Sequence, residues 1–161
     1  MDGQTFVTNT PEETMALGAR LVEALSREEG VRGTSTIVAL SGELGAGKTV
    51  FTKGMAQALG VEAQVTSPTF VLQKIYRLPD GAPWKHLIHI DAYRLEGEKE
   101  FEGIGWNDIA TDPGNLIVVE WPEQTGGAIP ERAIEVQFTE ERGDVRHIRV
   151  TNANIKNQNA K

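Results

Sequence analysis

One stretch sets the fold class of this chain: Gly42-Glu43-Leu44-Gly45-Ala46-Gly47-Lys48-Thr49 (GELGAGKT). It matches the pattern G-x-x-x-x-G-K-[ST] at every position. Glycines allow successive backbone N–H groups to turn inward around phosphate oxygens, because they carry no side chain that restricts the backbone. In this pattern the lysine, Lys48, reaches the β- and γ-phosphates, and the hydroxyl of Thr49 is a ligand for Mg²⁺. The stretch therefore predicts a phosphate-binding loop for a nucleoside triphosphate.

The segments on either side of the loop are those that the motif requires. Thr36–Leu40 is a short apolar run between glycines, which predicts a strand buried on both faces. From about Gly47 to Leu59 apolar residues recur at helical spacing, and Gly60 follows where a helix commonly ends. A helix that begins at the loop points the positive end of its dipole at a bound anion. A chance match in a glycine-rich surface loop is the alternative, and the order strand, loop, helix argues against it.

Two acidic residues follow apolar runs that we predict to be strands. Glu120 follows Leu116–Val119, and Asp91 follows Leu87–Ile90. Open α/β sheets bind ligands at the carboxyl ends of their strands, where a phosphate-binding loop needs a carboxylate for Mg²⁺. The run before Glu120 is the more thoroughly apolar, so we expect its strand beside that of the loop and Glu120 opposite Thr49 on the metal. Asp91 is then expected to position water; an ordinary strand-end residue is the alternative for each acid.

Other polar and aromatic residues near these strand ends carry weaker signals. Trp121 follows Glu120, and the sequence leaves open whether it contacts the nucleotide base, the loop or the core. The segment Thr66-Ser67-Pro68-Thr69 offers hydroxyls for a γ-phosphate or for water, with a plain turn as the alternative. His86 and His89 are spaced to point to opposite faces of a strand, so we expect solvated or hydrogen-bonded histidines rather than metal ligands.

The remaining sequence predicts a single α/β domain over residues 1–152. Thr10-Pro11-Glu12-Glu13 has the composition of a capping box and begins a helix that ends near Ser26–Gly30. Further elements are strands over Thr5–Thr8, Phe70–Leu78, Ala133–Thr139 and Val145–Thr151, and short helices over Glu96–Phe101 and Gly105–Ala110. The segment 153–161 has almost no apolar content, which predicts a disordered tail.

Composition narrows the classes of partner. The chain has 161 residues and a formal net charge of −7, which repels phosphate backbones, so we do not expect it to bind nucleic acid on its own. It has no cysteine, which excludes disulfides, thiolate nucleophiles and cysteine-ligated metal sites. The sequence has no signal-peptide pattern and no apolar run near the roughly 20 residues that span a bilayer, so we expect a cytoplasmic protein without a membrane partner.

Four motifs follow one another along the chain: GELGAGKT at 42–49, VTSPTFVLQKIY at 65–76, HIDAYRL at 89–95 and VVEWPE at 118–123. In this order and at this spacing they resemble the TsaE family, also called YjeE, the ATPases that assist bacterial synthesis of threonylcarbamoyladenosine in tRNA. The resemblance covers about residues 5–151. It implies a compact P-loop NTPase-like domain with a mixed central sheet flanked by helices.

The resemblance also implies a reaction, cofactors and partners. Its members bind ATP and Mg²⁺, hydrolyse ATP slowly alone, and dock on the heterodimer of TsaB and TsaD, so that tRNA is met only through that complex. Carried over, Glu43–Thr49 bind phosphates, Thr49 and Glu120 hold Mg²⁺, and Asp91 orients water or metal. The catalytic set is then Lys48, Asp91 and Glu120. Thr10, Trp121 and Arg146 are implied to lie near the nucleotide.

Three functional hypotheses remain at this point. The first is an ATPase that its partners activate. The second is a docking module that ATP occupancy controls, with incidental hydrolysis. The third is a small-metabolite kinase, although the arginines are scattered rather than gathered into a lid. A G-protein is excluded, because the chain has no N-K-x-D motif for guanine.

Overall fold

Four parallel strands form the centre of the sheet in the computed structural model of this chain, which describes residues 3–28, 33–66, 72–93, 95 and 98–152. The strands are β1 (Gln4–Thr8), β2 (Thr36–Ser41), β3 (Gln73–Arg77), β4 (His86–Asp91), β5 (Asn115–Glu120), β6 (Ile134–Glu140) and β7 (Arg146–Asn152). Their order is β1-β7-β6-β2-β5-β4-β3, in which β6, β2, β5 and β4 are parallel and the remaining pairs antiparallel. The predicted mixed sheet is confirmed.

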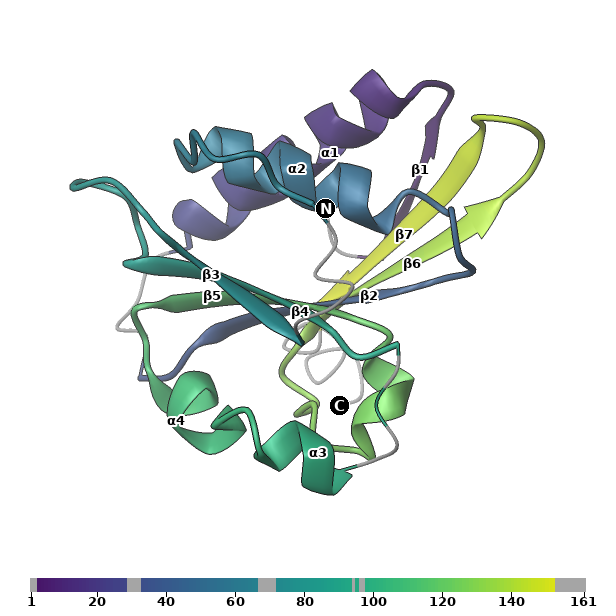
Figure 1. Cartoon of the computed structure of the whole chain (residues 1–161). Helices are drawn as coiled ribbons and strands as arrows, with labels where there is room; N and C mark the ends of the chain where they lie inside the picture. The colour runs from purple at the N-terminus through teal and green to yellow at the C-terminus, as the bar shows by residue number, and fades with distance from the viewer. Residues whose placement is uncertain (1–2, 29–32, 67–71, 94, 96–97, 153–161) are drawn as a thin grey trace, which may run out of the picture.

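Helices cover both faces of this sheet (Figure 1). On one face lie α1 (Pro11–Ser26) and α2 (Lys48–Ala58). On the other lie α3 (Glu98–Glu102), α4 (Trp106–Thr111) and the 3₁₀ turn η1 (Pro122–Thr125). This is the α/β architecture that the sequence predicts. None of the helices in the described ranges is long and apolar enough to cross a bilayer.

Burial on both faces explains the continuous apolar runs of the central strands. In β5, Leu116 and Val118 belong to the core beneath α1 and α2, whereas Ile117 and Val119 belong to the core beneath α3 and α4. Every residue of β5 is buried, and β2 is buried from Ile37 to Leu40. Such strands require an apolar residue at almost every position. The predictions for both runs are confirmed.

The capping box at the start of α1 is also confirmed. The hydroxyl oxygen of Thr10 accepts a hydrogen bond from the backbone N–H of Glu13 at 3.1 Å. The Glu13 carboxylate in turn accepts one from the backbone N–H of Asn9 at 2.7 Å. Thr10 therefore satisfies a backbone donor that the helix itself leaves unpaired, whereas the Glu13 carboxylate reaches Asn9, one residue before the N-cap residue that a standard capping box would use. A capping residue of this kind stabilises a helix by about 1 kcal/mol.

Helices α1 and α2 approach each other at two glycines. A methyl group built on Gly18 would collide with the backbone oxygen of Phe51, and one built on Gly54 would collide with the backbone oxygen of Met15. No longer side chain fits either position without moving a backbone. The two helices therefore pack with their main chains in direct contact, which holds the first turn of α2 close to α1.

Some boundaries differ from those predicted. Strand β3 begins at Gln73, and Leu72 before it is a bend, so the strand is shorter than the predicted Phe70–Leu78; 67–71 lie outside the described residues. At its other end, Leu78 has left the strand at the turn into β4. The turn η1 was not predicted at all. The tail 153–161 and the first part of the predicted helix, 96–97, also lie outside the described residues.

Gly54→Ala tests the contact between the two helices. In an ordinary helix interior alanine is more stabilising than glycine by about 1 kcal/mol. Here we expect alanine to destabilise the chain, because its methyl group must push one backbone away from the other. The free energy of unfolding should fall by about 2 kcal/mol and Tm by roughly 4–8 °C. Thermal melting followed by circular dichroism measures this. The exposed Gln57→Ala on the same helix is the control; a Gly54→Ala chain at least as stable as the control contradicts the packing.

Candidate nucleotide-binding site

The phosphate-binding loop connects β2 to α2. Its first glycine, Gly42, has a φ of 144°, and a Cβ there would lie 2.7 Å from the backbone oxygen of Phe138 on β6. Its last glycine, Gly47, has a φ of 101° and is the N-cap residue of α2, without a capping side chain. Backbones with positive φ strongly favour glycine. These two positions let the loop turn tightly and leave the N-terminus of α2 open, which is the geometry that favours a bound phosphate.

Lys48 lies across this loop, with its side chain buried. Its Nζ donates hydrogen bonds to the backbone oxygens of Gly42 at 2.5 Å and Glu43 at 3.1 Å. It also lies 4.1 Å from the centre of the Trp121 ring, within the range of a cation–π contact. Burial lowers the pKa of the Lys48 ammonium from its ordinary value of 10.5, and the nearby carboxylates, Glu120 first, oppose that shift.

Glu120 is brought to the loop by the pairing of β5 with β2. Glu120 pairs with Leu40 in the parallel register of these strands. Its Oε1 accepts a hydrogen bond from the Thr49 hydroxyl across 3.4 Å, although the residues are far apart in sequence. The predicted position of the β5 strand beside that of the loop is confirmed, and so is the proximity of Thr49 to Glu120.

The donor set at this point fits Mg²⁺. A hydroxyl and a carboxylate oxygen are both hard ligands, and Mg²⁺ is commonly held by one or two carboxylates together with substrate phosphates and water. Within the described ranges, no three histidine, aspartate or glutamate side chains gather as a metal cluster. The residues present thus suit a metal that arrives with a phosphate group, rather than a cage made by the protein alone.

His89 contacts the same carboxylate. Its Nε2 lies 2.8 Å from Glu120 Oε2, and both side chains are almost completely buried. The expectation that the histidines are solvated or hydrogen-bonded holds for His89, but its partner was missed. The signal was the alternation His89-Ile90-Asp91, which puts His89 and Asp91 on one face of β4. Only the order of the strands shows that this face adjoins Glu120.

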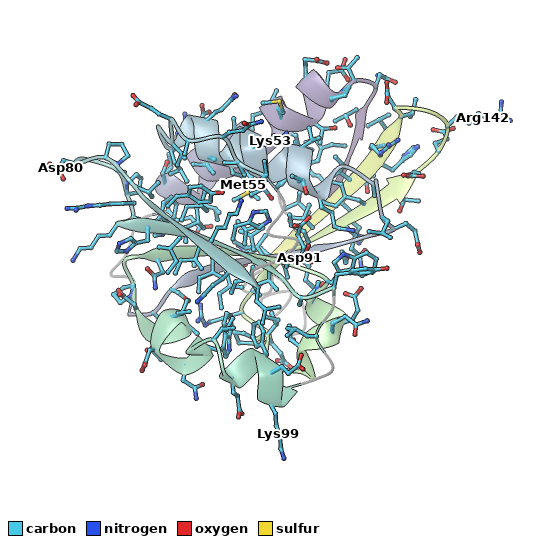
Figure 2. All side chains as sticks on the ribbon, in the orientation of Figure 1. Lys53, Met55, Asp80, Asp91, Lys99 and Arg142 are labelled. Carbon is cyan, nitrogen blue, oxygen red and sulfur yellow. The ribbon has the colours of Figure 1, made fainter. Side chains whose placement is uncertain are left out.

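Asp91 ends the strand next to that of Glu120. The two residues are direct partners in the parallel register of β4 and β5, so their side chains share one edge and one face of the sheet. Asp91, labelled in Figure 2, is half-buried. Its Oδ1 accepts a hydrogen bond from the backbone N–H of Tyr93 at 3.0 Å. Because β5 lies between β4 and β2, Asp91 is one strand farther from the loop than Glu120.

Trp121 has a backbone conformation that is rare for its type. Its φ is 60°, the only positive φ of a non-glycine among the described residues. This left-handed conformation costs about 1–2 kcal/mol. The backbone N–H of Trp121 donates to the Leu40 oxygen at 3.1 Å, and its ring packs against that of Tyr93 with centroids 5.0 Å apart. Of the three contacts left open by the sequence, the structure shows two: one with the loop, through Lys48, and one with the core beneath α3 and α4.

Arg146 supports the loop from outside. Its Nε donates to the backbone oxygen of Ala46, and its Nη2 donates to that of Gly45, both at 3.1 Å. Its guanidinium also lies 3.7 Å from the Glu140 carboxylate. Arg146 thus ties two consecutive loop carbonyls to β7, while the N–H of Ala46 donates within the loop to the Glu43 oxygen at 3.1 Å. A direct contact between Arg146 and a nucleotide stays a prediction.

Of the other predicted site residues, Glu43 and Leu44 belong to the loop itself, and Thr10 lies at the start of α1. Thr10 caps α1, and Thr14, one turn later, lies close to Gly47. Glu43 and Leu44 are exposed at the loop, with Leu44 63% exposed. The nearness of Thr10 to a nucleotide is not tested by these contacts. The Thr66 hydroxyl accepts a hydrogen bond from Lys74 Nζ at 2.7 Å, and the rest of the predicted hydroxyl segment lies outside the described residues.

Comparison with known proteins agrees with this geometry. The family model described as "Threonylcarbamoyl adenosine biosynthesis protein TsaE" matches residues 8–148. The chain belongs to the TsaE family. A TsaE relative from Streptomyces coelicolor is 40% identical over 141 residues, covering 84% of this chain and 87% of the relative. One from Bacillus subtilis is 35% identical over 144 residues, covering 89% and 82%.

A solved structure extends the match to the whole fold. The crystal structure of YdiB from Bacillus subtilis superposes with a TM-score of 0.73 and 26% sequence identity, covering 96% of this chain and 88% of that one. The family resemblance inferred from four motifs is thereby confirmed, together with the P-loop NTPase-like fold that it implied. Both relatives are named tRNA threonylcarbamoyladenosine biosynthesis protein TsaE, so the family to which this chain belongs is one of tRNA threonylcarbamoyladenosine biosynthesis.

Arg146→Met tests the support of the loop. Methionine keeps the apolar length of the side chain and removes its donors, so Gly45 and Ala46 lose their hydrogen bonds. Hydrogen bonds from a charged group contribute about 1.5–3 kcal/mol, so ADP affinity should fall roughly 10–100-fold while the fold is retained. Calorimetric titration with ADP measures this. Arg142→Met is the matched control, because Arg142 extends away from the molecule at the β6–β7 turn (Figure 2). Equal ADP affinity in both variants would refute this role.

Proposed function

We propose that this chain is a Mg²⁺-dependent ATPase that acts in the cytoplasm as an accessory factor in tRNA threonylcarbamoyladenosine biosynthesis. The observation that carries the proposal is the pairing of the Thr49 hydroxyl with Glu120 beside the glycine loop, 3.4 Å apart. A threonine directly after the loop lysine and a strand-end carboxylate are the two protein ligands that P-loop NTPases give to Mg²⁺. The family assignment supports the choice of pathway.

Some residues of the site bind the phosphates of the nucleotide, and others act in ATP hydrolysis. The N–H groups from Glu43 to Thr49, at the N-terminus of α2, attract the phosphates. Lys48 gives its positive charge to the β- and γ-phosphates, in exchange for the backbone oxygens of Gly42 and Glu43 that it contacts here. Bound ATP and Mg²⁺ supply the transferable phosphoryl group and the charge that stabilises its transfer. Asp91, beside Glu120, orients the attacking water.

The expected partners are TsaB and TsaD. We propose that this chain docks on their heterodimer and that its turnover serves repeated transfer of the threonylcarbamoyl group. The exposure of Glu43 and Leu44 on the loop supports dependence on a partner. A site that is open to water stabilises developing charge less well than a closed one, so a partner that covers the loop would raise the rate. The net charge of −7 supports a route to tRNA that runs through the partners rather than through this chain.

The test is an ATPase assay with and without purified TsaB and TsaD. We expect slow hydrolysis by the chain alone and faster hydrolysis with the partners. Lys48→Ala should lower the rate about 100-fold or more, because it removes a charge that stabilises the transition state, while circular dichroism stays native. Lys53→Ala, on the same helix but outside the loop, is the control. If Lys48→Ala hydrolyses ATP at the wild-type rate, the proposed role of Lys48 in ATP hydrolysis is wrong.

The two alternatives are separated when docking on the partners and the reaction products are measured together with the ATPase rate. If ATP strengthens docking on TsaB and TsaD but the partners leave turnover unchanged, the chain is a docking module controlled by nucleotide. If a phosphorylated small molecule accumulates instead of inorganic phosphate, the chain is a kinase. The loop alone fits each of these activities, so partner stimulation is the decisive measurement.

A second prediction separates Glu120 from Asp91. Glu120→Gln keeps the shape of the side chain and removes its charge, so the Mg²⁺ concentration for half-maximal ATPase rate should rise strongly, with little change in nucleotide binding without Mg²⁺. Asp91→Asn should lower the rate with a smaller shift in the Mg²⁺ midpoint. A Mg²⁺ titration of both variants measures this. If Asp91→Asn shifts the midpoint and Glu120→Gln does not, the metal role belongs to Asp91.

A further inference from the structure

The Glu120 carboxylate, proposed to hold Mg²⁺, has a second, buried contact with His89. His89, with no exposed side-chain surface, lies with its Nε2 2.8 Å from Glu120 Oε2. The two carboxylate oxygens therefore have different partners, because Oε1 accepts a hydrogen bond from the Thr49 hydroxyl. One oxygen is turned towards the loop, and the other is anchored in the sheet.

The strand order creates this anchor. His89 pairs with Val118 in the parallel register of β4 and β5, and Glu120 follows two residues later on the same face. Apolar residues precede both on that face: Leu87 on β4, and Leu116 and Val118 on β5. His89 thus follows apolar residues on this face and lies where the buried carboxylate of Glu120 adjoins it.

The hydrogen-bonding pattern assigns the donor. Among the described residues, His89 Nδ1 has no hydrogen-bond partner. A buried N–H without a partner costs about 1–3 kcal/mol, so the tautomer with its proton on Nε2 and a bare Nδ1 fits the site best. In that tautomer the histidine donates to Oε2, and the carboxylate keeps the negative charge that a cation needs.

We propose that His89 is a positioning residue for the metal site: its Nε2–H fixes the rotamer of Glu120 so that Oε1 points at Thr49. This inference rests on the proposed function, in which Glu120 and Thr49 hold Mg²⁺. Without the donor, Oε2 is buried and unpaired, and Glu120 rotates away to recover a hydrogen bond. Partners that orient a ligand in this way commonly contribute 10–100-fold to metal affinity.

Two amide variants test the inference. His89→Gln puts an amide nitrogen where Nε2 lies, whereas His89→Asn, one carbon shorter, puts it near Nδ1, out of reach of Glu120. The measurement is the Mg²⁺ dependence of binding of a non-hydrolysable ATP analogue, by calorimetry, so it does not depend on turnover. We expect the Mg²⁺ midpoint of His89→Asn to rise about 10–100-fold and that of His89→Gln to stay close to the wild type.

Controls separate positioning from stability. Asn115→Ala removes a buried polar side chain at the opposite end of β5, so it should lower Tm and leave the Mg²⁺ midpoint unchanged. If His89→Asn does not fold, His89→Leu removes the donor and fills the space. Equal midpoints in the amide variants, shifted or not, overturn the inference, because the position of the donor then has no effect. A wild-type chain and a Glu120→Gln chain with the same Mg²⁺ dependence overturn the metal assignment itself.

Discussion

The parallel pairing of β2 with β5 is the constraint on which the site depends. It puts Leu40, two residues before the loop, beside Glu120 at the end of the next strand. A parallel sheet gathers the carboxyl ends of its strands at one edge, so the loop and the carboxylate meet although they are far apart in the sequence. Strand β4 adds Asp91 and His89 to the same edge. Apolar runs on both faces keep these strands central, and thereby fix the register on which each polar contact relies.

Local chemistry explains which features could be predicted from the sequence. The glycine loop, the capping box at Thr10 and the apolar run before Glu120 each carry a signal within a few residues, and each was confirmed. The contacts of His89, Arg146 and Trp121 depend instead on which strands are neighbours. His89 reaches Glu120 only because β4 lies beside β5, and Arg146 reaches the loop only because β7 follows β6 in the sheet. No local pattern contains that order.

Charge around Lys48 links stability to function. Its ammonium is buried among carboxylates and backbone oxygens, and the ring of Trp121 covers it. A buried cation without such partners would be strongly unfavourable, so the loop supplies substitutes for the phosphate oxygens. The left-handed backbone of Trp121 belongs to the same arrangement, since it turns the ring back over Lys48 directly after Glu120. Under the proposed function, folding and phosphate binding thus depend on the same charged group, the Lys48 ammonium.

The contact between α1 and α2 has a mechanical consequence. With the carbonyl of Met15 against Gly54 and that of Phe51 against Gly18, neither helix can slide or rotate past the other without a collision between main chains. The two helices therefore move as one body, and Lys48 and Thr49, in the first turn of α2, move with the first turn of α1. Any adjustment at the loop must then be taken up by its torsions between Ser41 and Lys48, and a load applied at the start of α1 is transmitted directly to Lys48 and Thr49.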